Sequence, residues 1–255
     1  MAGHRAGGRS DSARGFGRAE GGLAAPPGRR CGGRCACGPR LAAGEAVGAL
    51  ASSDALAAVE YGAIADVVVT PDGRLVTGAS STPRGSYDGT VRLADLTGGT
   101  VEELAGPVEA EIRSRAAVLA AADLVGVARE ALTRTVAYDR ERRQFGVPVG
   151  SFQAIKHALA DLHCTVTMAE HAVLYAAHAV EVGVEDAPLA VAVAKAKAGD
   201  AALASTGAMI QYHGGIGYTW EHEAHLFYKR AKRLAGQWGD AATHRARIAE
   251  LTIAE

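Results

Sequence analysis

The second half of the chain repeats apolar residues at steps of three and four, and this periodicity most constrains what the chain can fold into. Such a spacing places the apolar side chains on one face of a helix. Aromatic residues make up only 5% of the chain, so the core between such helices must rely on close packing of small side chains. Two long stripes follow the repeat: Val118, Ala121, Ala122, Val125, Ala128, Leu132 and Val136, and then Phe152, Ile155, Leu159, Leu162, Val166, Ala169, Val173, Ala176 and Val180.

Start and stop signals divide this half into helices with short connections. Ser151 is a good N-cap for the second helix, which is predicted to run to about Val182. Further helices are predicted from just after Asp186 to Ile210, over about 219–235 and after Asp240. Short connections between long helices predict a mainly α protein, an up-down four-helix bundle over residues 107–255.

Residues 55–106 have the texture of strands rather than helices. The segment 65–70 reads ADVVVT, the turn residues Pro71 to Gly73 follow, and RLVT comes next, which predicts a hairpin. TVRLADL and TVEEL are further strand candidates. A small antiparallel β fragment is expected before the bundle.

The first 54 residues differ from both of these regions. Residues 1–40 hold eight Arg, no Lys and only two acids, so this stretch is basic while the rest of the chain is acidic. We expect a disordered leader, since a segment this poor in apolar residues cannot form a core. A nucleic-acid-binding arm is not favoured, because Lys and interleaved aromatic residues are missing. The CGGRCAC spacing is not a paired CxxC motif, so no metal site is predicted.

Several other classes are not supported. No apolar window is long enough to span a membrane and no secretory signal core is visible, so a cytoplasmic location is expected. A Gly-Lys dipeptide and a GxSxG motif are both absent, which excludes a Walker loop and a nucleophile elbow. His222 and His225 have a spacing that favours a polar helix surface over a metal site.

Two motifs remain, RERRQFG at 140–146 and QYHGGIGYTWE at 211–221. Guanidinium groups pair with a pyrophosphate in a bidentate way, and glycines let a ligand approach bare backbone N–H groups. Together the motifs suggest a site for an anionic cofactor. Taken alone, Arg140, Arg142 and Arg143 are better explained as a solvated helix end.

The run YDRERRQFGVPVGSFQAIKHALAD, followed by QYHGGIGYTWE, resembles the C-terminal helical domain of the acyl-CoA dehydrogenase family over about 107–245. Residues 60–105 resemble the tail of the family's middle β domain, and the family's N-terminal portion has no counterpart. The resemblance implies FAD-dependent α,β-dehydrogenation of an acyl-CoA thioester, with electrons passed to an acceptor flavoprotein.

The resemblance also implies a set of FAD contacts. Family members complete each FAD site with groups from a neighbouring subunit, so a homo- or hetero-oligomer is expected. Arg142 would contact the pyrophosphate, and the remaining contacts would come from Gln144, Phe145, Gln153, Gln211, Gly214 and Gly215.

The catalytic base departs from the family pattern. A carboxylate must abstract the α-proton, and the family places it at one of two positions. One lies about thirty residues before the FG pair and falls on Ala116, and the other lies six residues after Lys232 and falls on Trp238. Neither side chain accepts a proton. Asp240 is the nearest carboxylate to the second position, although an N-cap role for the last helix explains it equally well.

This pattern resembles the base-lacking subunit of actinobacterial heteromeric acyl-CoA dehydrogenases that act on steroid side-chain thioesters. The leading hypothesis is therefore a flavoprotein subunit that needs a catalytic partner. The alternatives are a self-sufficient acyl-CoA dehydrogenase with a relocated base and a flavin-free helical interaction module.

Overall fold

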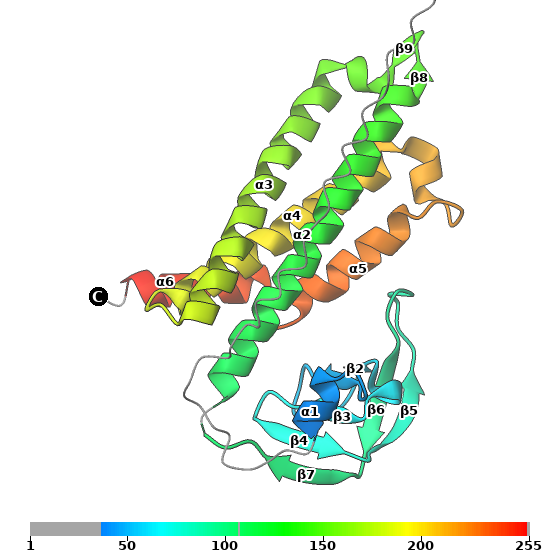
Figure 1. Ribbon diagram of the computed structural model, residues 1–255. Helices are drawn as coiled ribbons and strands as arrows, with labels where there is room; N and C mark the ends of the chain where they lie inside the picture. The colour runs from blue at the N-terminus through cyan, green and yellow to red at the C-terminus, as the bar shows by residue number, and fades with distance from the viewer. Residues whose placement is uncertain (1–36, 107, 254–255) are drawn as a thin grey trace, which may run out of the picture. The chain divides into compact units, whose positions relative to one another are not determined.

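The computed structural model describes residues 37–106 and 108–253, which belong to one compact unit (Figure 1). The predictions for residues 1–36 lie outside the described residues. The helices are α1 (Cys37–Ala42), α2 (Glu109–Glu141), α3 (Gln153–Val182), α4 (Ala187–Tyr212), α5 (Ala224–Gly236) and α6 (Ala241–Ile253). The strands are β1 (Gly48–Leu50), β2 (Val59–Glu60), β3 (Val67–Val69), β4 (Arg74–Thr77), β5 (Ser80–Arg84), β6 (Leu93–Thr97), β7 (Thr100–Glu103), β8 (Arg143–Gln144) and β9 (Val147–Pro148).

Helix α4 is the central element of the bundle. It packs against α2, α3, α5 and α6, and its buried positions are mostly alanine. Small side chains allow several helices to approach one axis closely, which explains why an alanine-rich helix occupies the middle. The mainly α fold class predicted from the periodicity is confirmed.

The two predicted apolar stripes form the core between α2, α3 and α4. Val125 and Leu132 of α2 and Val166 and Val173 of α3 are buried together. One position differs, because Ala122 is exposed while a neighbouring leucine of α2 is completely buried. The stripe therefore predicted the correct face of α2 with a small rotational error.

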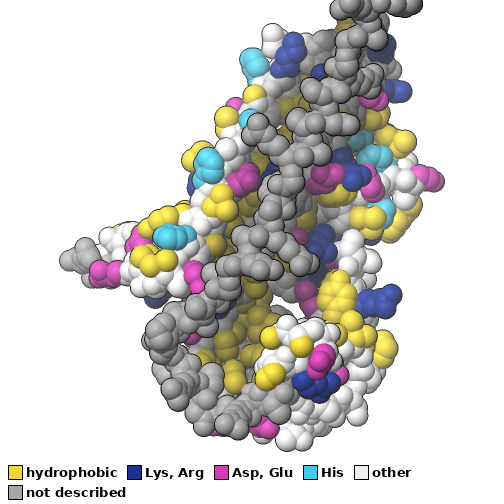
Figure 2. Space-filling view, in the orientation of Figure 1, with side chains coloured by type: hydrophobic (Ala, Val, Ile, Leu, Met, Phe, Trp, Pro, Cys, Tyr) yellow, Lys and Arg dark blue, Asp and Glu magenta, His cyan; other side chains and the backbone are white. Residues whose placement is uncertain are grey.

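Helix α3 lies at the outside of the bundle. One of its faces contributes to the core, whereas Met168, Leu174 and Tyr175 on other faces are at least half exposed. Apolar and charged side chains alternate over the surface of the helices (Figure 2). None of the described helices is long and apolar enough to cross a membrane.

The strand region forms two small sheets with the orders β1-β3-β4-β7 and β2-β6-β5. The predicted hairpin is confirmed, because β3 and β4 pair antiparallel with Val67 opposite Thr77, and Gly73 has the positive φ of 84° that its turn requires. The expectation of a purely antiparallel fragment is wrong, since β1 pairs parallel to β3 with Gly48 opposite Val67. Parallel neighbours need a long connection, which local patterns do not reveal.

Several predicted element boundaries also differ from those in the structure. Helix α1 and strand β1 fall within the residues 1–54 expected to be leader, so ordered structure begins before residue 55. Ser151 is not the N-cap of α3. It ends a short 3-10 helix (Val149–Ser151) in which its hydroxyl donates to the carbonyl of Pro148 at 2.6 Å, and Phe152 takes the N-cap position instead. The helix predicted over 219–235 begins only at Ala224, after a 3-10 helix at Gly214–Tyr218.

Candidate functional site

The arginine-rich motif forms the end of α2 and a hairpin. Arg142 is the C-cap of α2, where its N–H donates to the carbonyl of Tyr138 at 2.8 Å and its backbone turns to the extended conformation. Strands β8 and β9 then pair around Phe145 and Gly146, whose φ angles are 52° and 82°. Positive φ at both central residues is what a type I′ hairpin needs. The hairpin leaves Phe145 94% exposed at its tip.

The glycine motif forms the 3-10 helix that follows α4. Gly217 is sterically required there, because a Cβ at this position would lie 2.5 Å from the carbonyl oxygen of Ile210. Gly214 adopts a φ of 64°, which glycine tolerates without penalty. The turn therefore depends on glycines for its shape.

A stacked pair of rings joins the two motifs. The imidazole of His213, just before the glycines, stacks on the ring of Tyr138 with centroids 4.3 Å apart. His213 is buried, and its Nδ1 lies 2.7 Å from the carbonyl of Met209. Burial lowers the pKa of His213, so the neutral ring is favoured in this contact.

The two motifs line one pocket of about 450 Å³. Four of the predicted FAD contacts meet there, namely Arg142, Gln144, Gly214 and Gly215. The other lining residues are Tyr138, Val149, Tyr212, His213 and Ile216.

The three remaining predicted contacts do not line this pocket. Phe145 lies at the hairpin tip with its ring edge toward Phe152, at 6.3 Å between centroids. Gln153 is the first residue of α3, and Gln211 lies exposed in the last turn of α4.

The lining of this pocket offers groups that could hold an anion. Within the described part of the chain, the guanidinium of Arg142 makes no hydrogen bond or ion pair, and the side chain is exposed. Its five donors in a planar fork suit two phosphate oxygens. A Cβ added at Gly214 or Gly215 would meet no atom within 4 Å, so the backbone there borders open space that a ligand can enter.

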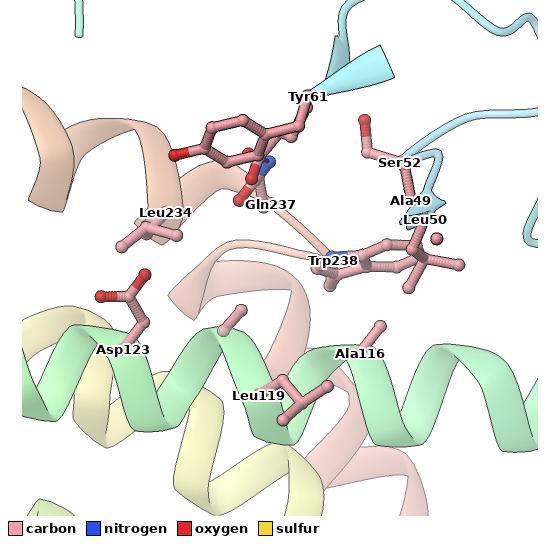
Figure 3. Close-up of a pocket in the computed structure, with 13 residues that line it drawn as sticks. Ala49, Leu50, Ser52, Tyr61, Ala116, Leu119, Asp123, Leu234, Gln237 and Trp238 are labelled. Atoms are coloured by element: carbon pink, nitrogen blue, oxygen red, sulfur yellow. Dashed lines mark hydrogen bonds between the residues drawn. The ribbon is translucent and has the colours of Figure 1, made fainter. Parts of the chain in front are cut away.

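A second pocket, of about 290 Å³, is lined by Ala116 and Trp238, the two positions at which the sequence resemblance predicts the base (Figure 3). Ala116 and Leu119 come from α2, Trp238 from the loop after α5, and Leu50 and Tyr61 from the strand region. Two positions more than a hundred residues apart in sequence thus border one cavity. Neither Ala116 nor Trp238 carries a group that accepts a proton.

The carboxylates of this second pocket are held by arginines. Asp123 accepts hydrogen bonds from the Nε and Nη2 of Arg230. Glu60 accepts from Arg233 and from the amide of Gln237. Both carboxylates of the pocket are therefore engaged in ion pairs with α5.

Arg233 also anchors the strand region to α5. Its Nε donates to Asp88 at 2.7 Å, and the Asp88 side chain is completely buried. Burial raises the pKa of Asp88, but the hydrogen bonds from Arg233 and Thr90 outweigh it and hold the pKa below its ordinary value. This ion pair therefore stabilises one wall of the second pocket at neutral pH.

Asp240 does not line the second pocket, and its carboxylate caps α6. Its Oδ1 accepts from the N–H of Thr243 at 2.8 Å and from the hydroxyl of Thr243 at 2.7 Å. These hydrogen bonds lower the pKa of Asp240, which opposes proton abstraction. The N-cap role that the sequence offered for Asp240 accounts for its geometry.

Besides Asp88, two further buried charged residues were missed by reasoning from the sequence. Asp139 lies directly before the arginine motif, yet it is 1% exposed and neither carboxylate oxygen has a hydrogen-bond partner in the described structure. Lys195 of α4 is also 1% exposed. The alanine-rich pattern around Lys195 was a usable signal, because α4 offers few solvated faces.

The comparisons with known proteins show the family to which this chain belongs. The family model described as acyl-CoA dehydrogenase, C-terminal domain, matches residues 113–252. Acyl-CoA dehydrogenase IpdE2 of Mycobacterium tuberculosis is 42% identical over 176 residues, which cover 68% of this chain and 53% of that protein. Acyl-CoA dehydrogenase FadE34 of the same organism is 41% identical over 156 residues, covering 61% of this chain and 22% of that protein. The chain spans about half the length of IpdE2.

Solved structures support the same fold. A variant of the steroid ACAD Tcur3481-Tcur3483 matches with a TM-score of 0.69 and 28% identity, over 81% of this chain and 62% of that chain. Butyryl-CoA dehydrogenase from Megasphaera elsdenii matches with a TM-score of 0.75 and 21% identity, over 84% of this chain and 70% of that chain, which shows a shared fold.

Proposed function

Because the chain belongs to the acyl-CoA dehydrogenase family, we propose that it is a flavoprotein subunit that completes an FAD site while a partner subunit supplies the catalytic base. The observation that carries this proposal is the second pocket. It contains both family base positions, filled by Ala116 and Trp238, and its own carboxylates Asp123 and Glu60 are paired with arginines.

The first pocket gives this chain its part in cofactor binding. Arg142 and Gln144 would hold the diphosphate, and the backbone of Gly214 and Gly215 would close over it. Gln211, Phe145 and Gln153 would contact the cofactor part bound mainly by a neighbouring subunit. When bound, FAD supplies the two-electron acceptor for oxidation of the acyl-CoA thioester, and an electron-accepting flavoprotein would then reoxidise it.

A hetero-oligomer is favoured by one of the similar structures. The steroid ACAD among the similar structures bears a name that joins two components, Tcur3481 and Tcur3483. A partner that keeps a glutamate at one of the two base positions would restore proton abstraction.

The test is purification of the chain alone and together with such a partner, followed by the flavin absorption spectrum and its bleaching by acyl-CoA. We expect bleaching only with the partner present. Bleaching by the chain alone would refute the partner requirement and support a self-sufficient enzyme. Absence of flavin under both conditions would refute the proposal and leave the flavin-free interaction module.

A further inference from the structure

Lys195 extends from the central helix α4 to the loop that joins α5 and α6. Its Nζ donates to the carbonyl of Ala235 at 3.1 Å and to the carbonyl of Gly239 at 2.9 Å. Lys195 is the largest of the completely buried side chains in the described structure. A buried ammonium is stable only when its donors are satisfied, so both carbonyls are firmly held.

The same loop has an unusual backbone. Trp238 has a φ of 56° and Gly239 a φ of 93°. A bulky residue rarely adopts positive φ, and such a conformation persists only when its surroundings enforce it. His244 of α6 provides one restraint, because its Nε2 lies 2.9 Å from the carbonyl of Trp238. Lys195 restrains the carbonyls of Ala235 and Gly239, which come before and after Trp238 in the chain.

The strained residue is also a wall of the second pocket. The indole of Trp238 faces the cavity across from the side chains of α2 (Figure 3). A shift in its backbone would move a large ring and change the volume open to a ligand. The loop conformation therefore determines the shape of the pocket.

We propose that Lys195 is a positioning residue that clamps the loop between α5 and α6, so that Trp238 is held in its strained conformation as a fixed wall of the second pocket. The clamp limits how much of an acyl group the pocket admits. Only the identity of that ligand rests on the proposed function, because the clamp itself is a property of this chain's own residues.

The titratable groups around Lys195 indicate that its restraint on the loop depends on pH. Burial lowers the pKa of Lys195 to about 8, and the nearby carboxylate of Asp240 opposes that effect. His244 faces the same loop from α6, and burial lowers its pKa as well. Above the pKa of Lys195 the amine is neutral and its bonds to the two carbonyls weaken. The clamp should therefore loosen on the alkaline side, whereas His244 is already neutral at pH 7.

Tryptophan fluorescence tests the clamp directly, since Trp220 and Trp238 are the only two tryptophans. In the full chain with Trp220→Phe, Trp238 is the sole reporter. Adding Lys195→Met should raise acrylamide quenching of Trp238 about twofold, because the loop opens locally. Lys197→Met is the matched control, since Lys197 is exposed on the same helix, and it should change nothing. Unchanged quenching in folded Lys195→Met would overturn the proposal.

A second measurement needs no substitution at Lys195. In the Trp220→Phe chain, quenching should rise from about pH 7 to about pH 9.5 as a buried lysine deprotonates. A flat profile with intact helical circular dichroism would overturn the proposal, even if Lys195→Met does not fold. These measurements use no flavin or acyl-CoA, so failure of the clamp is distinguishable from failure of the proposed function.

Discussion

Replacing Asp139 with asparagine should stabilise the protein at neutral pH. Asp139 lies at the end of α2, 1% exposed, with no partner for either carboxylate oxygen in the described structure. Burial raises the pKa of Asp139 from 3.8 to about 6. The charged form of Asp139 is disfavoured in the folded protein, so this rise in pKa lowers the free energy of unfolding by about 3 kcal/mol once Asp139 is ionised.

The pH dependence identifies the cause. Below pH 3.8 the carboxyl is neutral in both the folded and the unfolded chain, so its ionisation costs nothing there. As pH rises, the unfolded chain releases the proton first, and the loss of stability is complete above about pH 6. Asparagine has the same shape and no charge. Asp139→Asn should therefore gain little at pH 4 and about 3 kcal/mol at pH 7.5.

Urea denaturation followed by circular dichroism at intervals from about pH 4 to about pH 8 measures this gain. Asp161→Asn is the control, because Asp161 is exposed on α3 and substitutions at exposed positions change stability little. A gain for Asp139→Asn that does not grow with pH would refute the reasoning, since it would then come from packing and not from ionisation. A loss of stability at pH 7.5 would mean that the carboxylate has a partner.

Three further predictions concern the pockets and the turn. Arg233→Met should lower the free energy of unfolding by about 3 to 5 kcal/mol at pH 7, because it leaves Asp88 buried and unpaired. Urea denaturation should show a smaller loss at acid pH, where Asp88 is neutral. An equal loss at neutral and acid pH would point to packing alone. Arg142→Ala should weaken FAD retention by about 2 kcal/mol through loss of a charge-assisted contact, which equilibrium dialysis of the complex measures. Arg140→Ala is the control, because Arg140 does not line that pocket. Equal effects of the two substitutions would show that Arg142 has no special role. Gly217→Ala should lower the melting temperature and loosen the glycine turn, since the added methyl would meet a backbone carbonyl of α4 at 2.5 Å; a folded variant with unchanged melting would contradict the required close approach.

The helices could be predicted from the sequence because their signals are local. The spacing of apolar residues in 118–136 and 152–180 depends only on the helical repeat, and the structure confirms both helices. The hairpin around Gly73 was equally readable, because Pro and Gly act within a few residues. Ser151 shows the limit of such signals. Its side chain suits an N-cap, yet Ser151 lies in a 3-10 turn, in which Gly150 lies close to the backbone of Asp139, a residue of helix α2.

Some parts of the candidate site could likewise be predicted from the sequence, and other parts could not. The two motifs of the first pocket could be found in the sequence, because each is a continuous run and both resemble a known family. Phe145 could not be placed by counting, since the type I′ turn moves its ring away from the pocket that its neighbours line. The N-cap role of Asp240 was readable as one of two alternatives, and its bonds to Thr243 account for it.

By itself the sequence determined the helical bundle, the β hairpin, the two motifs of the first pocket and the absence of a proton acceptor at Ala116 and Trp238. Only the tertiary structure decided that these two positions border one cavity, that Arg233 holds a buried carboxylate and that Lys195 reaches the loop beside Trp238. The physical reason is the separation along the chain of the residues that each interaction joins. Helix and turn preferences act over a few residues, whereas burial, ion pairing and strain depend on groups brought together from distant parts of the chain.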